Sequence, residues 1–106
     1  MHDLVANFIR NGQIDSFQKL RLLLFLHQYP ESTGTSQQFA EYLHLGDVPL
    51  LEKIINDLQM AGLVNCVENR CKLNTAPDIL LHLQYLTKAF DDPLARQEIL
   101  DQVRRG

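Results

Sequence analysis

Two cysteines, Cys66 and Cys71, are the residues of this chain with the most obvious chemistry. The polar Glu68-Asn69 pair between them predicts a two-residue hairpin turn, which places Cys66 opposite Cys71 on the neighbouring strand. In such a non-hydrogen-bonded pair the Cα atoms approach to about 4.5 Å, so a cross-strand disulfide could form. The two cysteines are then a redox pair; alternatively, both are small hydrophobic residues on the inner face of the hairpin in a reducing cytosol.

Metal binding and enzyme catalysis find little support in the sequence. The four histidines are His2, His27, His44 and His82. None pairs with another at a spacing of four or lies close to a cysteine in a zinc pattern, so we predict no metal site. A glycine-rich phosphate loop and a nucleophile elbow are both missing, and the carboxylates are scattered as on a solvated surface. We therefore expect a protein that is not an enzyme and needs no cofactor.

Length and composition are those of one globular domain. The chain has 106 residues, of which 45% are hydrophobic, and a formal net charge of −3. No apolar run approaches the roughly 20 residues that cross a bilayer, and the start MHDLVANFIRNG lacks the pattern of a signal peptide. We expect a cytoplasmic protein without a membrane segment. The negative charge argues against a generally adhesive polycation.

The segment 35–73 organises the rest of the chain. Its first helix is expected to begin with a capping box, in which the Thr35 hydroxyl accepts from the Gln38 backbone and the Gln38 side chain returns to Thr35. Gly46 is expected to take the positive φ that ends this helix. Asp47 then caps the next helix, which carries Pro49 in its first turn.

The second helix of this segment has one apolar stripe, formed by Leu51, Ile54, Ile55 and Leu58. Gly62 supplies its C-terminal stop, and the hairpin follows. This order, together with the sequence Asp57-Leu58-Gln59-Met60-Ala61-Gly62-Leu63-Val64, resembles the core of bacterial winged helix-turn-helix transcription regulators of the MarR-like, ArsR-like and PadR-like groups. The resemblance implies a mainly α fold with a small β-hairpin wing and additional N- and C-terminal helices. It also implies a small DNA-binding transcription regulator.

In those families the second helix enters the major groove and the wing touches the backbone or the minor groove. The positions that the resemblance carries over to this chain are Val48, Pro49, Glu52, Lys53 and Asn56 on the helix and Asn69, Arg70 and Lys72 on the wing. Asn56 could contact adenine, Glu52 a cytosine amine, and Lys53 a guanine or a phosphate. A phosphate could also be held at the start of the first helix, by Thr35, Ser36 and Gln37.

Charge opposes this assignment. Residues 35–64 contain four acids and one base, a balance of 1 − 4 = −3. Because phosphate neutralisation supplies most non-specific affinity for DNA, binding would depend on Arg70, Lys72 and any contribution of Lys19 or Arg21. The alternative function is a winged-helix protein–protein interaction module that does not bind DNA.

The flanking helices complete a single domain made of an N-terminal helix (1–13), a winged-helix core (14–75) and C-terminal helices (76–106). The helix expected over residues 17–29 is apolar almost all round from Leu22 to Leu26, so it should be central. The apolar face of the C-terminal helices is broader than a small domain needs, which predicts a homodimer. The expected interface consists of Ile79, Leu83, Leu86 and Phe90. Alternatively, the terminal helices simply cover the core.

Overall fold

The computed structural model describes residues 3–105, and the side chains of residues 3–104. Within this range the chain is mainly helical with one two-stranded antiparallel hairpin, as the sequence predicts. The elements are α1 (Asp3–Asn11), α2 (Phe17–Gln28), α3 (Ser36–Tyr42), α4 (Val48–Met60), β1 (Val64–Val67), β2 (Arg70–Leu73), α5 (Pro77–Phe90) and α6 (Pro93–Arg105). Residues 1, 2 and 106 of the predicted domain lie outside the described part.

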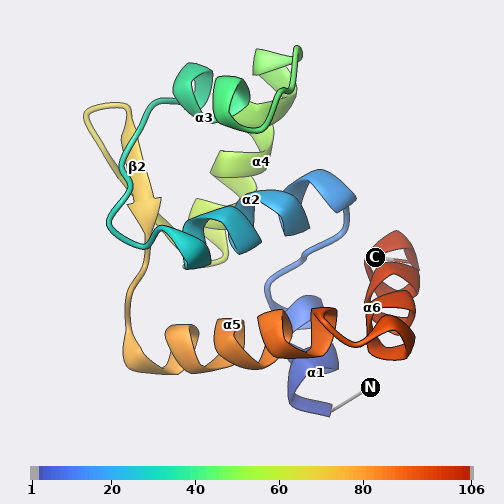
Figure 1. Cartoon of the computed structure of the whole chain (residues 1–106). Helices are drawn as coiled ribbons and strands as arrows, with labels where there is room; N and C mark the ends of the chain where they lie inside the picture. Colours follow the sequence, from blue (N-terminus) through green and yellow to red (C-terminus); the bar gives the residue numbers. More distant parts are fainter. Residues whose placement is uncertain (1–2, 106) are drawn as a thin grey trace.

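Helix α2 lies at the centre of the molecule (Figure 1). Its side chains Leu20, Leu22, Leu23 and Leu26 are at most 1% exposed. Because these leucines point in several directions around the helix, neighbours are needed on several sides. The helices α4, α5 and α6 and the strand β2 all pack against it. The central position predicted for this helix is therefore confirmed.

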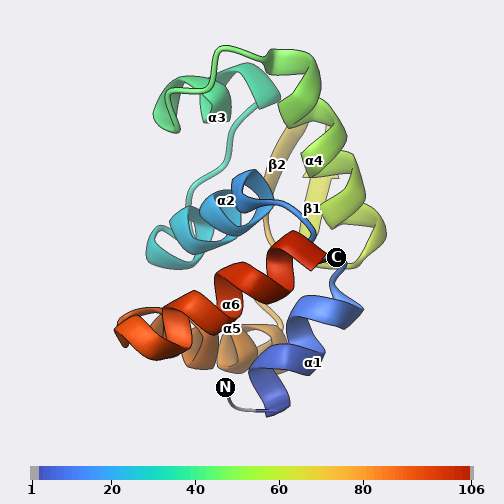
Figure 2. The same ribbon diagram turned by 90° about the vertical axis from the view of Figure 1, so that its right-hand side faces the viewer.

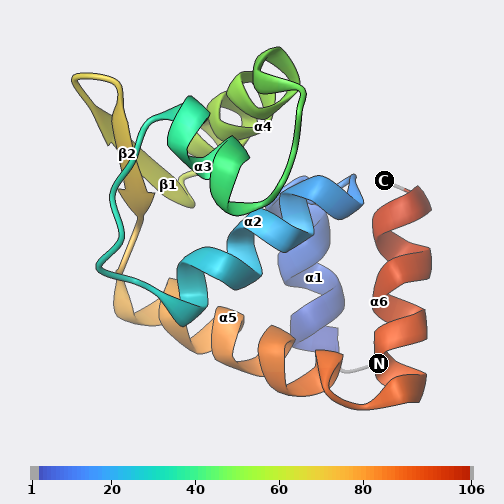
Figure 3. The same ribbon diagram turned by 45° about the horizontal axis from the view of Figure 1, so that its top comes forward.

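The other elements form two groups on either side of α2 (Figures 2 and 3). On one side, α1 packs against both α5 and α6. The Gln102 side chain of α6 donates a hydrogen bond to the Ala6 carbonyl of α1, at 2.9 Å, which joins the two ends of the chain. On the other side, α3 packs against α4, and β1 lies against α4.

The predicted dimer interface on α5 is wrong for two of its four residues. Leu83 and Leu86 have no exposed surface, because α1, α2 and α6 of the same chain cover them. Ile79 and Phe90 are partly buried against the same core. The broad apolar face of α5 is thus used within one chain, and it gives no reason of its own to expect a second copy. Homodimerisation remains a prediction.

Helix ends follow the local sequence, with one exception. The capping box of Thr35 and Gln38 is present, and the Asp47 carboxylate accepts from the Leu50 amide at 3.0 Å. The predicted positive φ at Gly46 is wrong, because α3 ends earlier and His44 takes the left-handed conformation, with φ 57°. The His44 amide donates to the Glu41 carbonyl and the Leu45 amide to the Ala40 carbonyl, the bond pattern of a Schellman motif.

Helix α4 ends in the same motif, with glycine in the left-handed position as predicted. Gly62 has φ 81°, its amide donates to Gln59, and the Leu63 amide donates to Leu58. The peptide of Leu63 therefore leaves the helix in the direction of β1. This glycine sets the angle between α4 and the hairpin.

Lys19 is a buried charged residue in α2, with 4% of its surface exposed. Its ammonium lies 2.7 Å from the Asp15 carboxylate and 3.1 Å from that of Asp57, and it donates to the Gln13 carbonyl at 3.1 Å. Burial by itself lowers the pKa of Lys19, but the hydrogen bonds and charges of Asp15 and Asp57 outweigh it and raise the pKa above 10.5. Lys19 ties α2 to α4 and to the preceding loop.

The suggestion that Lys19 or Arg21 helps to neutralise DNA phosphates is therefore wrong for Lys19. Arg21 is half-buried, and its guanidinium donates to the Leu43 carbonyl at 2.9 Å. It closes the C-terminal end of α3 against α2. Both bases serve packing between helices.

Replacing Gly62 with alanine should lower the free energy of unfolding by about 1–2 kcal/mol, the cost of a Cβ in the left-handed region. No neighbouring atom lies within 4 Å of the added Cβ, so the loss is conformational rather than steric. Gly46→Ala is the matched control, because its Cβ would also meet nothing within 4 Å and its φ is not positive. Urea denaturation should show the control at or above wild-type stability. Equal losses in both variants would contradict this account of Gly62.

Replacing Lys19 with methionine should lower the free energy of unfolding by about 1–3 kcal/mol, because two carboxylates and one carbonyl lose their common donor. The raised pKa means that the folded protein holds this proton more tightly than the unfolded chain. The stabilisation is thus complete below the unfolded pKa of 10.5 and is lost as the pH rises through the folded pKa.

The measurement is urea denaturation of wild type and Lys19→Met between about pH 9 and about pH 11.5. The gap in unfolding free energy between the two proteins should narrow over this range. A gap that widens with pH would contradict the assigned ion pairs.

Candidate nucleic-acid interface

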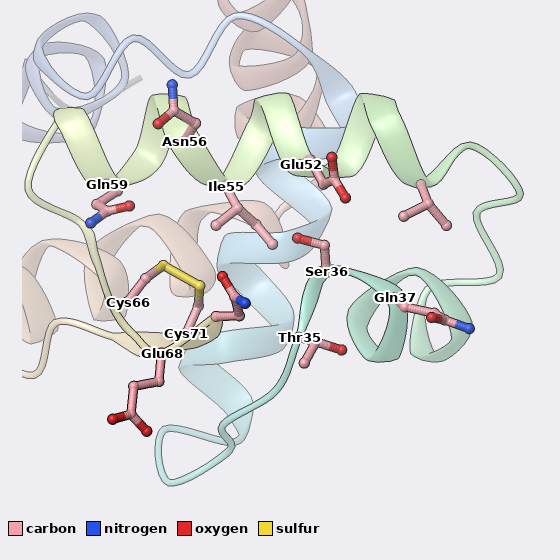
Figure 4. A pocket seen from close by; sticks show the side chains of 12 residues that line it. Thr35, Ser36, Gln37, Glu52, Ile55, Asn56, Gln59, Cys66, Glu68 and Cys71 are labelled. Atoms are coloured by element: carbon pink, nitrogen blue, oxygen red, sulfur yellow. A yellow bond between two sulfur atoms is a disulfide. The ribbon is translucent and has the colours of Figure 1, made fainter.

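A groove of about 840 Å³ runs between α4 and the hairpin and reaches the start of α3 (Figure 4). We call it the α4–hairpin groove. Three separate segments line it: residues 35–37, the outer face of α4, and the hairpin around its turn. The chain forms it because α3 and the hairpin both pack against α4 and leave the polar face of that helix uncovered between them.

Helix α4 supplies one wall of this groove. Glu52, Ile55, Asn56 and Gln59 line it and recur at the three- and four-residue spacing of one helix face. In Figure 4 the Glu52 carboxylate extends toward Ser36, whereas the Asn56 amide points away from the hairpin. The Asn56 amide lies 3.8 Å from the Met60 sulfur, a weak acceptor that leaves the rest of the amide to other partners.

The start of α3 supplies the second wall, with Thr35, Ser36 and Gln37. The Thr35 hydroxyl already accepts from the Gln38 amide at 3.2 Å, and the Gln38 side chain accepts from the Thr35 amide at 3.0 Å. Two of the donors that a helix start could offer a phosphate are therefore used inside the capping box. Contact with a phosphate through Ser36 or Gln37 remains a prediction.

The hairpin supplies the third wall and has the register that the sequence predicts. Val67 pairs with Arg70 and Cys66 with Cys71. Glu68 and Asn69 both have positive φ, 52° and 67°, as a type I′ turn requires. The chain thereby closes the hairpin with only two residues.

Strand alternation separates the side chains of the hairpin into two faces. Cys66 and Cys71 share the inner face with the buried Val64 and Leu73, and a disulfide joins the two cysteines. The bases Arg70 and Lys72 lie at positions whose side chains are exposed. The Arg70 guanidinium donates to the Thr33 hydroxyl at 3.3 Å.

The charge of the groove wall is negative. Glu52 and Glu68 are its charged side chains, and among the described residues that line it there is no lysine, arginine or histidine. Glu68 lies at the outer rim, where Figure 4 shows its carboxylate pointing away from α4. Lys53, Arg70 and Lys72 are exposed but do not line the groove. Any anion that enters meets carboxylates first, and the bases lie outside.

The structure brings together most of the residues that sequence analysis proposed for DNA contact. Those that line the groove are Thr35, Ser36, Gln37, Val48, Glu52, Asn56 and Asn69. Those that do not are Pro49, Lys53, Arg70 and Lys72. Sequence analysis did not propose Gln59 or Glu68 for DNA contact. Gln59 lies seven positions after Glu52 on the same helix face, and this spacing would have identified it.

The histidines do not form a site within the described part of the chain. His27 Nδ1 lies 3.1 Å from the Thr87 hydroxyl, and the His82 ring stacks on Phe8 at 5.5 Å between centroids. His2 lies outside the described residues. Among residues 3–104, no three His, Cys, Asp or Glu side chains gather closely enough to hold a metal ion.

Comparison with known proteins adds no identification. No protein-family model, curated protein or solved structure matches the chain. Across residues 3–105, every helix is too short or too polar to cross a bilayer. The geometry and charge of the groove are the observations that bear on function.

Proposed function

We propose that the chain is a winged helix-turn-helix protein that binds duplex DNA as a small transcription regulator. The order α3, α4, hairpin is the order of that motif, with α4 as the recognition helix and the hairpin as the wing. A further pairing supports the assignment. Gly34, just before α3, pairs with Cys71, so the hairpin gains a bridge to a third segment.

The observation that carries the proposal is the convergence of three segments on one groove. The exposed face of α4 offers Glu52 and Asn56, and the flanking segments offer Ser36 and Asn69. Placed in the major groove, α4 would present Asn56 to adenine and Glu52 to the amine of cytosine. The hairpin, next to it, would lie along the adjacent backbone.

Contact with phosphates must come from outside the groove. Lys53 on α4 and Arg70 and Lys72 on the hairpin are exposed bases next to it. Three phosphate contacts predict a slope of log affinity against log salt of about −3 per protomer. A homodimer, which we also propose, would double this slope and the number of base contacts. With so few phosphate contacts, affinity for DNA would depend more on hydrogen bonds to bases than on electrostatic attraction to the backbone.

The double variant Arg70→Ala with Lys72→Ala should reduce the salt slope to about −1 per protomer and abolish measurable binding at moderate salt. Fluorescence anisotropy of a labelled duplex at several salt concentrations measures both effects. The charge-matched control is Lys88→Ala with Arg104→Ala, exposed bases on α5 and α6. The control should keep the wild-type slope. An unchanged slope in the hairpin variant would remove the hairpin from the DNA contact.

A second function, docking of a protein partner, is favoured by the negative wall of the groove. Among the described residues the wall carries two carboxylates and no base, and the apolar residues Met60 and Val67 nearby are 81% and 72% exposed. Carboxylates beside exposed apolar surface suit a basic, partly apolar segment of another protein. This proposal requires no contact with phosphate.

The variant Glu68→Gln separates the two functions, because it removes one negative charge at the rim without a change of shape. For DNA, the loss of repulsion should raise affinity several-fold at low salt and leave the salt slope unchanged. For a basic partner, affinity should fall. Anisotropy with a random duplex and with an arginine-rich peptide gives both results, and weaker duplex binding by Glu68→Gln would argue against the DNA proposal.

A further inference from the structure

The disulfide between Cys66 and Cys71 lies inside the candidate groove. It joins β1 to β2 at the second pair from the turn, and both cysteines line the groove. Cys66 is half-buried, whereas Cys71 is 6% exposed. Figure 4 shows the bond between α4 and the segment that leads into α3. Because Cys66 is the more exposed residue of the two, we expect a reagent in the groove to reach its sulfur first.

The backbone of Cys71 connects this bond to a second wall of the groove. The Cys71 amide donates to the Gly34 carbonyl at 2.8 Å, and the Gly34 amide donates to the Cys71 carbonyl at 3.1 Å. Gly34 directly precedes Thr35, the N-cap of α3. On the opposite strand, β1 packs against α4. The disulfide thus holds together the two strands that contact the two other walls.

We propose that Cys66 and Cys71 form a reversible thiol–disulfide site, and that its redox state sets how rigidly the hairpin and residues 33–35 frame the groove. The consequence for DNA rests on the function proposed above. In the disulfide form the groove is held in shape before a ligand arrives, so less ordering is needed on binding. In the dithiol form the hairpin keeps its strand pairing but loses the covalent link at its outer end.

Reduction requires two equivalents of a low-molecular-weight thiol. The first thiolate attacks the accessible sulfur of Cys66 and forms a mixed disulfide, while the bonding electron pair leaves with Cys71, which takes a proton from water. The second thiolate attacks the external sulfur of the mixed disulfide and releases Cys66. The products are one external disulfide and two protein thiols. A disulfide oxidant of the same class reverses these steps.

The position of the two cysteines makes both redox forms compatible with the fold. Cys71 shares the inner face of the hairpin with Leu73, which has no exposed surface. A reduced cysteine behaves as a small hydrophobic residue, so it keeps this packing. Disulfides in reducing compartments are typically transient and sense or catalyse redox change. The pair can therefore change state without unfolding of the core.

The experiment uses the full chain, equilibrated in buffers of oxidised and reduced glutathione. Alkylation followed by intact mass should find no free thiol in the oxidising buffer and both thiols of the chain in the reducing buffer. Hydrogen exchange at the amides of Gly34 and Cys71 should accelerate on the order of ten-fold on reduction, because the segment they join loses its covalent constraint. Duplex affinity should fall by a similar factor.

The variant Cys66→Ala with Cys71→Ala is the control. It should show the fast exchange of the reduced form at Gly34 in both buffers. Two free thiols that persist in the oxidising buffer, or a disulfide that resists reduction in the folded protein, would overturn the inference. So would equal exchange rates at Gly34 and Cys71 in both redox states.

Hydrogen exchange and duplex affinity together distinguish the proposed redox site from the proposed DNA binding. If exchange responds to the redox state while neither form binds duplex, the redox site stands and the DNA proposal fails. If both forms bind duplex with equal affinity, the claim that the redox state controls DNA binding is wrong.

Discussion

The constraint on which the rest of this structure depends is the burial of α2. Leu20, Leu22, Leu23 and Leu26 cover too much of the helix circumference for one neighbour to shield. The chain therefore surrounds α2 with α4 and β2 on one side and with α5 and α6 on another. The groove follows from this arrangement, because α4 and the hairpin each contribute one face to the core and keep the other face outside.

Packing between helices also engages several of the basic side chains, so fewer of them are available to bind an anion. Lys19 sits in that core with Asp15 and Asp57, and Arg21 holds the end of α3. Arg96 is engaged in the α5–α6 turn, where it donates to the Phe90 carbonyl at 2.7 Å. Bases that would attract DNA on a different scaffold thus connect helices on this one. The groove is left with acidic, neutral polar and apolar side chains. Under the proposed function, recognition there depends on shape and on directed hydrogen bonds more than on general attraction.

The hairpin connects the packed core around α2 with the α4–hairpin groove. Its inner face reaches from Leu73 in the core to the disulfide in the groove, and its backbone reaches Gly34 at the entrance to α3. Under the redox proposal, a change at the sulfur pair acts on a wall of the groove without disturbing α2.

The sequence by itself determined the features that depend on residues a few positions apart. These are the capping box of Thr35 and Gln38, the Asp47 cap, the stop at Gly62 and the two-residue turn that sets Cys66 opposite Cys71. Only the tertiary structure decided which apolar faces are covered, because that depends on segments far apart in the chain. Leu83 and Leu86 are buried in the protein's own core, and Lys19 forms ion pairs with Asp15 and Asp57. Helix α3 ends at Tyr42, and the left-handed residue that follows it is His44 rather than Gly46. In each case the outcome depends on contacts between segments far apart in the chain, which the spacing of neighbouring residues does not specify.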